Sequence, residues 1–299
     1  MNKPLVSFFL GTLNRKEVIR ETLQKLYEQT YRPIEIVVVD NHSSDGTAEM
    51  IEQDFPEVKL IRLTRNHGHV ASRNIACVNT RGKYVVCLDD DAFPGKDAIT
   101  RMVEEFQKDD ILGLIVFDIY LHDPYIGYYD TEDHIPREQQ VVEKYNWSGC
   151  GGAYRREIVE KLGFWEEWGI ESPCESSIGA KAMLMGYTGK QFSDIYIFHH
   201  WSQVGDPATF RVYHLANKIG CRSYVLFIIK YFPADARMLK SLLEIAWISI
   251  FNLLETGSFS LLRGFLSAWT KVPYILRERM PLTWQQAKRL SLSFNFKGH

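Results

Sequence analysis

The stretch that decides the fold is YVVCLDDD, residues 84–91, an apolar run that ends in three consecutive aspartates. Such a run is typical of a strand buried on both faces of a sheet. Two similar runs precede it, at residues 5–10 and 34–39, and the second of them leads directly into Asp40. Segments with helical periodicity separate the runs, for example residues 14–27. This alternation predicts an α/β fold with a mostly parallel central sheet flanked by helices.

Asp40 and the triplet Asp89, Asp90 and Asp91 all follow strands of this predicted sheet. Ligands of open α/β folds bind outside the carboxyl ends of the strands. Adjacent carboxylates repel one another unless a cation or hydrogen-bond donors stabilise them. Their hard oxygen atoms favour Mg²⁺ or Mn²⁺, ions that usually also hold substrate phosphates. The triplet alone is also compatible with a solvated acidic turn.

Two enzyme classes that also place acids at strand ends are disfavoured. A dinucleotide-binding Rossmann domain needs G-x-G-x-x-G after its first strand, whereas the first turn here contains only Gly11. An oxidoreductase therefore ranks below a transferase. A nucleotidyltransferase would also use acids at strand ends, but the chain lacks an early glycine-rich phosphate loop that carries Arg or Lys.

The composition and the charge limit which other classes of protein are compatible with the sequence. The chain has 299 residues, of which 45% are apolar, and its 35 basic and 37 acidic side chains give a net charge of −2. Such a balance argues against a nucleic acid as the main partner. The charge is uneven, because the residues up to 206 hold 22 basic and 33 acidic side chains, whereas residues 207–299 hold 13 and 4. An acidic body thus carries a basic tail with a net charge of +9.

The basic tail and the cysteines bear on location. Five cysteines without a C-x-x-C pair, and an N-terminus without signal-peptide features, predict a reduced, cytoplasmic protein. The longest apolar stretch, residues 245–254, is shorter than the roughly 20 residues of a membrane span. The tail combines its charge with aromatic residues such as Trp247 and Trp269, which suits peripheral contact with the inner face of the plasma membrane. The alternative is that these residues pack on the body or pair subunits in a homo-oligomer.

Several motifs together carry a family resemblance. The loop RNHGHVASRN, residues 65–74, suits a diphosphate at a helix N-terminus. With the opening stretch VSFFLGTLNR, residues 6–15, with VVVDNHSSDGT, residues 37–47, and with the three aspartates as a DxD-type motif, it resembles the inverting family 2 glycosyltransferases. Their nucleotide-sugar-binding fold is called GT-A. The resemblance runs from Val6 to about Tyr187.

The resemblance implies roles for individual residues. The residues expected to bind the nucleotide sugar are Thr12, Asn14, Arg15, Asp40, Asn66, Arg73, Asp89 and Asp90. The residues expected to hold a divalent metal, Mn²⁺ or Mg²⁺, are Asp89, Asp91, His199 and His200. The two histidines follow an apolar strand, and imidazole is a compatible ligand, but a structural role is the alternative for them.

The resemblance also implies a carboxylate that acts as general base on the acceptor hydroxyl. The family commonly has a Glu-Asp pair at the start of a helix that ends in Gly-Tyr, and counting back from residues 186–187 places this pair on Cys174 and Glu175. Glu175 is therefore the first candidate for the base and Glu171 the second. A helix-capping carboxylate is the alternative for either.

The acceptor is expected to contact a group of glycines and tryptophans, namely Trp147, Gly151, Gly152, Trp165 and Trp168. Tryptophan rings stack on sugars through apolar contact, although tryptophans buried in the core are the alternative.

These observations combine into one prediction of organisation and function. Residues 1–206 are expected to form a GT-A catalytic domain, with 1–118 as the nucleotide-sugar-binding half and 119–206 as the acceptor-binding half. Residues 207–299 form a helical, basic C-terminal region. The predicted reaction is metal-dependent, inverting transfer of a hexosyl or deoxyhexosyl group from a UDP- or dTDP-sugar. The acceptor is expected to be a hydroxyl of a glycan or a lipid-linked acceptor. The expected process is the synthesis of a cell-envelope polysaccharide or glycoconjugate. Because Cys174 stands where Glu is expected, the alternative is a non-catalytic nucleotide-sugar-binding scaffold.

Overall fold

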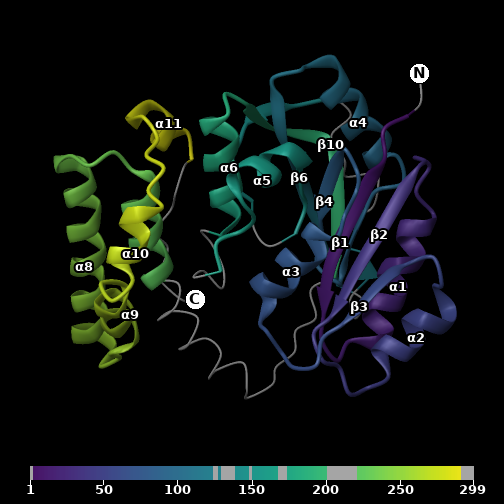
Figure 1. The fold of residues 1–299 in the computed structure, drawn as a ribbon, viewed down its shortest axis with the longest axis horizontal. Helices are drawn as coiled ribbons and strands as arrows, with labels where there is room; N and C mark the ends of the chain where they lie inside the picture. Colours follow the sequence, from purple (N-terminus) through teal and green to yellow (C-terminus); the bar gives the residue numbers. More distant parts are fainter. Residues whose placement is uncertain are drawn as a thin grey trace.

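The computed structural model describes residues 3–123, 127–128, 139–147, 150–167, 174–200 and 221–290. Its described strands form one ten-stranded sheet with helices on both faces, and a second group of helices lies beside one of those faces (Figure 1). The predicted fold class is confirmed. The predicted domain boundary at residue 206 lies outside the described residues.

The sheet combines a parallel half with a mixed half. Its strands are β1 (Val6–Thr12), β2 (Ile34–Asp40), β3 (Lys59–Arg62), β4 (Tyr84–Cys87), β5 (Ala92–Pro94), β6 (Leu112–Asp123), β7 (Gly127–Tyr128), β8 (Val141–Glu143), β9 (Gly152–Arg155) and β10 (Thr188–His200). The order is β3-β2-β1-β4-β9-β6-β10-β5, with β7 on β6 and β8 on β10. Strands β3, β2, β1 and β4 are parallel neighbours, and the register pairs Thr12 with Asp40. Their carboxyl ends therefore meet at one edge.

Strand β9 departs from the parallel order. It lies between β4 and β6 and runs antiparallel to both. Its four residues are too few to show a periodicity in the sequence. Gly152 in this strand permits a close approach, because a Cβ at this position would lie 2.4 Å from the indole ring of Trp147.

The helices of the body form two layers, and those of the tail form a separate group. The body helices are α1 (Lys16–Tyr27), α2 (Thr47–Asp54), α3 (His69–Val78), α4 (Ala98–Lys108), α5 (Arg156–Leu162) and α6 (Cys174–Leu184). The tail contains a helical stretch at residues 221–231, followed by α8 (Ala236–Thr256), α9 (Ser260–Ala268), α10 (Val272–Arg277) and α11 (Trp284–Arg289). None of the described helices combines the length and apolar character that a membrane span requires.

Alternate residues of the central strands enter two different cores. Phe9 of β1 packs in a core that also contains buried residues of α3, α5 and α6. Its neighbours Phe8 and Leu10 pack in the core formed with α1, α2 and α4. This alternation is the expected consequence of a strand covered by helices on both faces. The apolar run at residues 5–10 is thereby explained.

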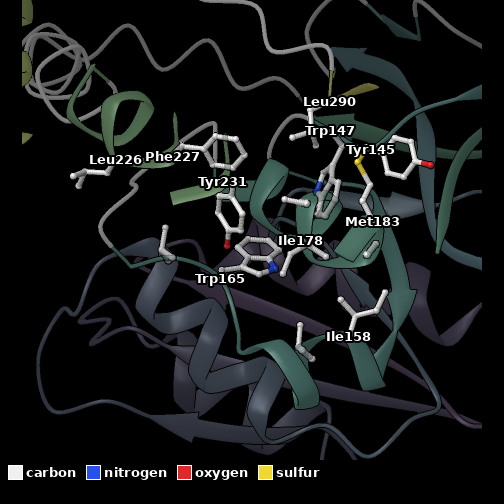
Figure 2. Close-up of a cluster of buried hydrophobic side chains, with 14 of the residues drawn as sticks. Tyr145, Trp147, Ile158, Trp165, Ile178, Met183, Leu226, Phe227, Tyr231 and Leu290 are labelled. Carbon is white, nitrogen blue, oxygen red and sulfur yellow. The ribbon is translucent and has the colours of Figure 1, made fainter. Parts of the chain in front are cut away.

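The tail joins the first of these cores. Figure 2 shows Phe227 and Tyr231 of the tail in one buried cluster with Trp165 and Ile178 of the body. Leu290, just after α11, reaches the same cluster. This part of the tail therefore packs on the body.

A buried group of charges fastens the tail to the body. The carboxylate of Glu166 accepts hydrogen bonds from Lys230 Nζ at 2.9 and 3.0 Å and from the hydroxyl of Tyr231 at 2.6 Å. Lys181 Nζ of α6 lies 3.2 Å from the same carboxylate. Burial alone would raise the pKa of Glu166, but the two ammonium groups outweigh it and the pKa is lowered.

Candidate active site

The aspartate triplet lies just past β4, and its middle member is tied to β1 and α1. The hydroxyl of Thr12, at the end of β1, donates to Asp90 Oδ2 at 2.7 Å, and the hydroxyl of Thr22 donates to the backbone oxygen of Asp90 at 2.8 Å. Arg15 Nε lies 3.2 Å from Asp90 Oδ1. Burial raises the pKa of Asp90 to about 6, and Arg15 and Thr12 offset only part of this effect.

Asp91 bridges two cationic or basic side chains. Arg15 Nη2 lies 2.6 Å from Asp91 Oδ2, and His199 Nε2 lies 3.1 Å from Asp91 Oδ1. Burial opposes ionisation of this carboxyl, but the hydrogen bond with His199 and the charge of Arg15 prevail, so its pKa is lowered. Asp91 is thus held as a carboxylate beside the imidazole of β10.

A candidate metal position lies at the same place. Ligand atoms of Asp89, Cys150 and His199 lie within 4.8 Å of one another. Burial raises the pKa of the Cys150 thiol to about 12, and a neutral thiol is a poor ligand for a hard ion. The carboxylate of Asp89 and the imidazole of His199 are ligand types that Mn²⁺ accepts, and Asp91 reaches this group through its 3.1 Å contact with His199.

The residues around Asp40 form a second polar group at the same sheet edge. The backbone N–H of Ser43 donates to Asp40 Oδ2 at 3.1 Å, whereas the buried Oδ1 has no hydrogen-bond partner in the described part of the chain. Such an atom is costly to bury unless a ligand donates to it. Asn14, with a left-handed φ of 53°, accepts from the backbone N–H of Ser44 at 2.7 Å and so joins the two turns.

Asn66 helps to shape the basic loop that precedes α3. Its side-chain oxygen accepts hydrogen bonds from Asn41 Nδ2 and from the backbone N–H of Gly68, both at 2.8 Å. These bonds connect the turn after β2 with the start of α3. Asn66 therefore holds the loop in place, whether or not it also contacts a ligand.

Arg73 connects the triplet to the candidate base. This buried residue of α3 forms an ion pair with Asp89, and its Nη1 lies 3.5 Å from Glu175 Oε1. Glu175 is itself buried near the start of α6. The guanidinium also lies over the ring of Trp165, with Cζ 5.1 Å from the ring centroid. Arg73 thus lies between Asp89 and the carboxylate of Glu175, which could accept a proton.

Two of the tryptophans expected at the acceptor side lie in the core, and one of the glycines joins two strands. Trp147 and Trp165 are buried and pack against each other with ring centroids 6.2 Å apart. Both rings therefore lie in the core, and their contact with an acceptor stays a prediction. Gly151 has a left-handed φ of 81° and donates its backbone N–H to Cys87 at 3.0 Å, so it joins β4 to the start of β9.

Some of the expected site residues lie outside the described ranges. Other residues lie at the site although the sequence did not point to them. Glu171 and Trp168 lie outside the described residues, as do the side chains of Cys174 and His200. Of the residues missed, Cys150 reaches the site only because β9 inserts beside β4, a pairing that no spacing in the sequence indicates. Thr22 was missed because it lies within an ordinary amphipathic helix.

These features define the class of protein: a GT-A-type nucleotide-sugar-binding fold with acidic residues and a histidine at the strand edge. Residues 7–163, more than half of the chain, match the model of the family "Glycosyl transferase family 2". The chain belongs to this family.

Solved structures agree with the fold. S. aureus TarS 1–349 in complex with UDP-GlcNAc superposes with a TM-score of 0.63 at 16% identity, over 91% of this chain and 81% of that chain. A mannosyltransferase, PcManGT from Pyrobaculum calidifontis in complex with GDP-Man and Mn²⁺, superposes with a TM-score of 0.57 at 19% identity, over 97% of this chain and 75% of that one. At these identities the likeness concerns the fold.

Relatives by sequence are named synthases. The poly-beta-1,6-N-acetyl-D-glucosamine synthase of Staphylococcus epidermidis is 28% identical over 173 residues, which are 54% of this chain and 42% of the relative. The enzyme of the same name from Staphylococcus aureus strain COL is 26% identical over 193 residues, 61% of this chain and 46% of the relative. The chain thus matches less than half the length of these curated relatives.

Proposed function

We propose that this protein is a metal-dependent, inverting glycosyltransferase that uses a nucleoside-diphosphate sugar. The observation that carries the proposal is the chain of contacts from His199 through Asp91 and Arg15 to Asp90, and from Asp89 through Arg73 to Glu175. It unites a hard-ion donor set with a candidate base. Relatives named as poly-beta-1,6-N-acetyl-D-glucosamine synthases favour a glycan acceptor. We extend the proposal to lipid-linked glycans and to cell-envelope synthesis.

Each residue in this chain has a proposed task. Asp89, Asp91 and His199 would hold Mn²⁺ or Mg²⁺, which when bound stabilises the negative charge on the departing diphosphate. Asp40 would accept a hydrogen bond from the base of the nucleotide. Glu175 would take the proton of the acceptor hydroxyl as its oxygen bonds to the anomeric carbon and the bond from that carbon to the diphosphate breaks, which inverts the configuration.

The donor class can be tested by ligand-dependent stability. We expect UDP or dTDP with Mn²⁺ or Mg²⁺ to raise the thermal unfolding temperature of the protein, because a ligand that binds only the native state stabilises it. The effect should vanish with chelator, and GDP and CDP serve as comparisons. Stabilisation by a nucleotide without acceptor-dependent transfer or donor hydrolysis would instead support the non-catalytic scaffold. No shift with any nucleotide would contradict nucleotide-sugar binding altogether.

We also propose that the tail contacts an anionic membrane, as found on the cytoplasmic face of a plasma membrane. Spaced four residues apart on α8, Leu243, Trp247 and Phe251 are 60%, 66% and 49% exposed, and Leu254 is 77% exposed. Exposed apolar residues in one stripe mark an interaction surface. The excess of basic residues in the tail complements anionic lipid.

Vesicle flotation tests this contact. The full chain should float with vesicles that contain phosphatidylglycerol at low salt and not with neutral vesicles. A Trp247→Ser, Phe251→Ser double variant should lose the binding, whereas Ile111→Ser, which changes an apolar side chain of the body that is 59% exposed, should keep it. The contrary result has two parts: the wild-type chain does not float, and it forms a dimer that the same double variant dissociates. This result would assign the stripe to subunit pairing.

A further inference from the structure

A cleft of about 1360 Å³ lies between the body and the tail. On the side of the body it is lined by Asn74 of α3 and by residues 162–167, at the end of α5 and just after it. On the side of the tail it is lined by Tyr274 and Arg277 of α10 and by neighbouring residues. The roles proposed above for the metal, the nucleotide and the base use none of these residues.

The cleft adjoins the catalytic chain of contacts through Trp165. The backbone of Trp165 is fixed by both atoms of the Asn74 amide, at 2.9 Å each, and its ring lies under Arg73. Arg73 in turn contacts Glu175. Only Trp165 would therefore separate a molecule in the cleft from Arg73, the residue that contacts the candidate base Glu175.

Cations outnumber acids in the lining of the cleft. Three glutamates face six basic residues, which are Lys181, Arg222, Lys230, Lys271, Arg277 and Arg279. At the base of the cleft, Glu166 already neutralises part of this charge through Lys181 and Lys230.

Glu278 also pairs with Lys230, at 3.5 Å, so the excess positive charge of the lining comes from other basic residues. Lys271 and Arg277 are exposed, and no ion pair joins either of them to another residue of the ranges described above. Between them on α10, the ring of Tyr274 is 53% exposed and offers an apolar face. Arg279 instead holds the tail together, since it donates to the backbone oxygen atoms of Ile229 and Phe232.

We propose that this cleft binds a phosphate group of the acceptor. Lys and Arg side chains recognise phosphate, whereas a neutral glycan gains little from them. The position proposed above for the donor diphosphate is a different one, beside Asp89 and Asp91, and Arg73 lies between Asp89 and Trp165. The inference rests on the proposed transferase function, because it assigns the bound phosphate to the acceptor.

Two sources could supply this phosphate: the diphosphate of a lipid-linked acceptor, or the phosphodiester of a glycan or polyol polymer. Two probes distinguish them, namely farnesyl diphosphate and a short oligomer of glycerol phosphate. Farnesol and a neutral maltooligosaccharide serve as the uncharged controls for these two probes. All binding is measured with the full chain in saturating UDP and Mn²⁺, so that the donor position is blocked.

We expect one of the two phosphate probes to bind, and both uncharged controls to bind poorly. The Lys271→Glu, Arg277→Glu double variant should weaken that binding at least about tenfold, since two attractive charges become repulsive. The control is Lys240→Glu with Lys288→Glu, two lysines of the tail outside the cleft, and it should change the affinity less than about twofold. Stabilisation by UDP and Mn²⁺ should be the same in all three proteins.

Binding that is equal in the wild-type chain and the Lys271→Glu, Arg277→Glu variant would overturn the assignment, as would the absence of binding of both phosphate probes at low salt. A loss of the same size in the control variant would show only non-specific attraction to the basic tail. If the probe binds but UDP and Mn²⁺ do not stabilise the protein, the proposed transferase function fails, and the cleft is then a phosphate site without an acceptor role.

Discussion

Replacement of Asp91 by Asn is expected to lower kcat/KM for sugar transfer by about 10³-fold or more. Asp91 contacts Arg15 and His199 through its two oxygen atoms, and an amide offers only one acceptor and no negative charge. A metal ion supplies several kcal/mol of charge stabilisation at the leaving diphosphate, and about 1.4 kcal/mol corresponds to a factor of ten in rate. Initial rates over a Mn²⁺ titration measure the effect.

Two further variants separate a metal role from a structural one. His199→Ala should show a similar defect at low Mn²⁺ that higher Mn²⁺ partly relieves, because one ligand is lost and the carboxylates remain. Asp110→Asn changes an exposed aspartate away from the site and should be neutral in rate. Transfer by the Asp91→Asn variant at the wild-type rate, with an unchanged Mn²⁺ dependence, would remove Asp91 from the metal site.

Replacement of Glu175 by Gln is expected to reduce transfer by about 10²- to 10⁴-fold, the contribution typical of a general base. Glutamine keeps the size of the side chain but cannot take the proton of the acceptor hydroxyl. Stabilisation by UDP and Mn²⁺ should be retained, since Arg73 still pairs with Asp89. Transfer rates at saturating donor, together with the nucleotide-induced thermal shift, measure both effects.

The position of Glu175 calls for a control on stability. Its carboxylate is buried beside Arg73, and loss of one partner of a buried ion pair can destabilise a protein by about 3–5 kcal/mol. Urea unfolding of the variant therefore accompanies the kinetics, with Glu160→Gln on the exposed face of α5 as the matched control. A folded Glu175→Gln variant with wild-type transfer would exclude this residue as the base and make Glu171 the next candidate.

The sequence also left two interpretations open, and the structure shows where the side chains concerned lie. Tryptophans in the acceptor half were expected either to stack on sugars or to lie in the core, and Trp147 and Trp165 are buried. Tail aromatics were expected either to pack on the body or to meet a membrane. Among these aromatics, Phe265 and Trp284 pack against the buried cluster, whereas Trp247 and Phe251 are exposed. Composition cannot separate these outcomes, because it does not record which neighbour covers a side chain.

The sequence by itself determined the α/β fold and the acidic edge of the sheet. The apolar runs that end in Asp40 and in the triplet are local patterns, and parallel strands bring their carboxyl ends to one edge. Local periodicity and capping residues are short-range properties, so a single sequence displays them.

Only the tertiary structure decided which distant side chains meet. The pairing of β9 with β4, the contact of Arg73 with Glu175, and the attachment of the tail through Glu166 and Lys230 join segments 64 to 102 residues apart in the chain. The cleft between α3 and α10 exists only because that attachment sets the tail beside the body. Such contacts depend on how whole layers pack against one another, and sequence spacing does not encode that packing.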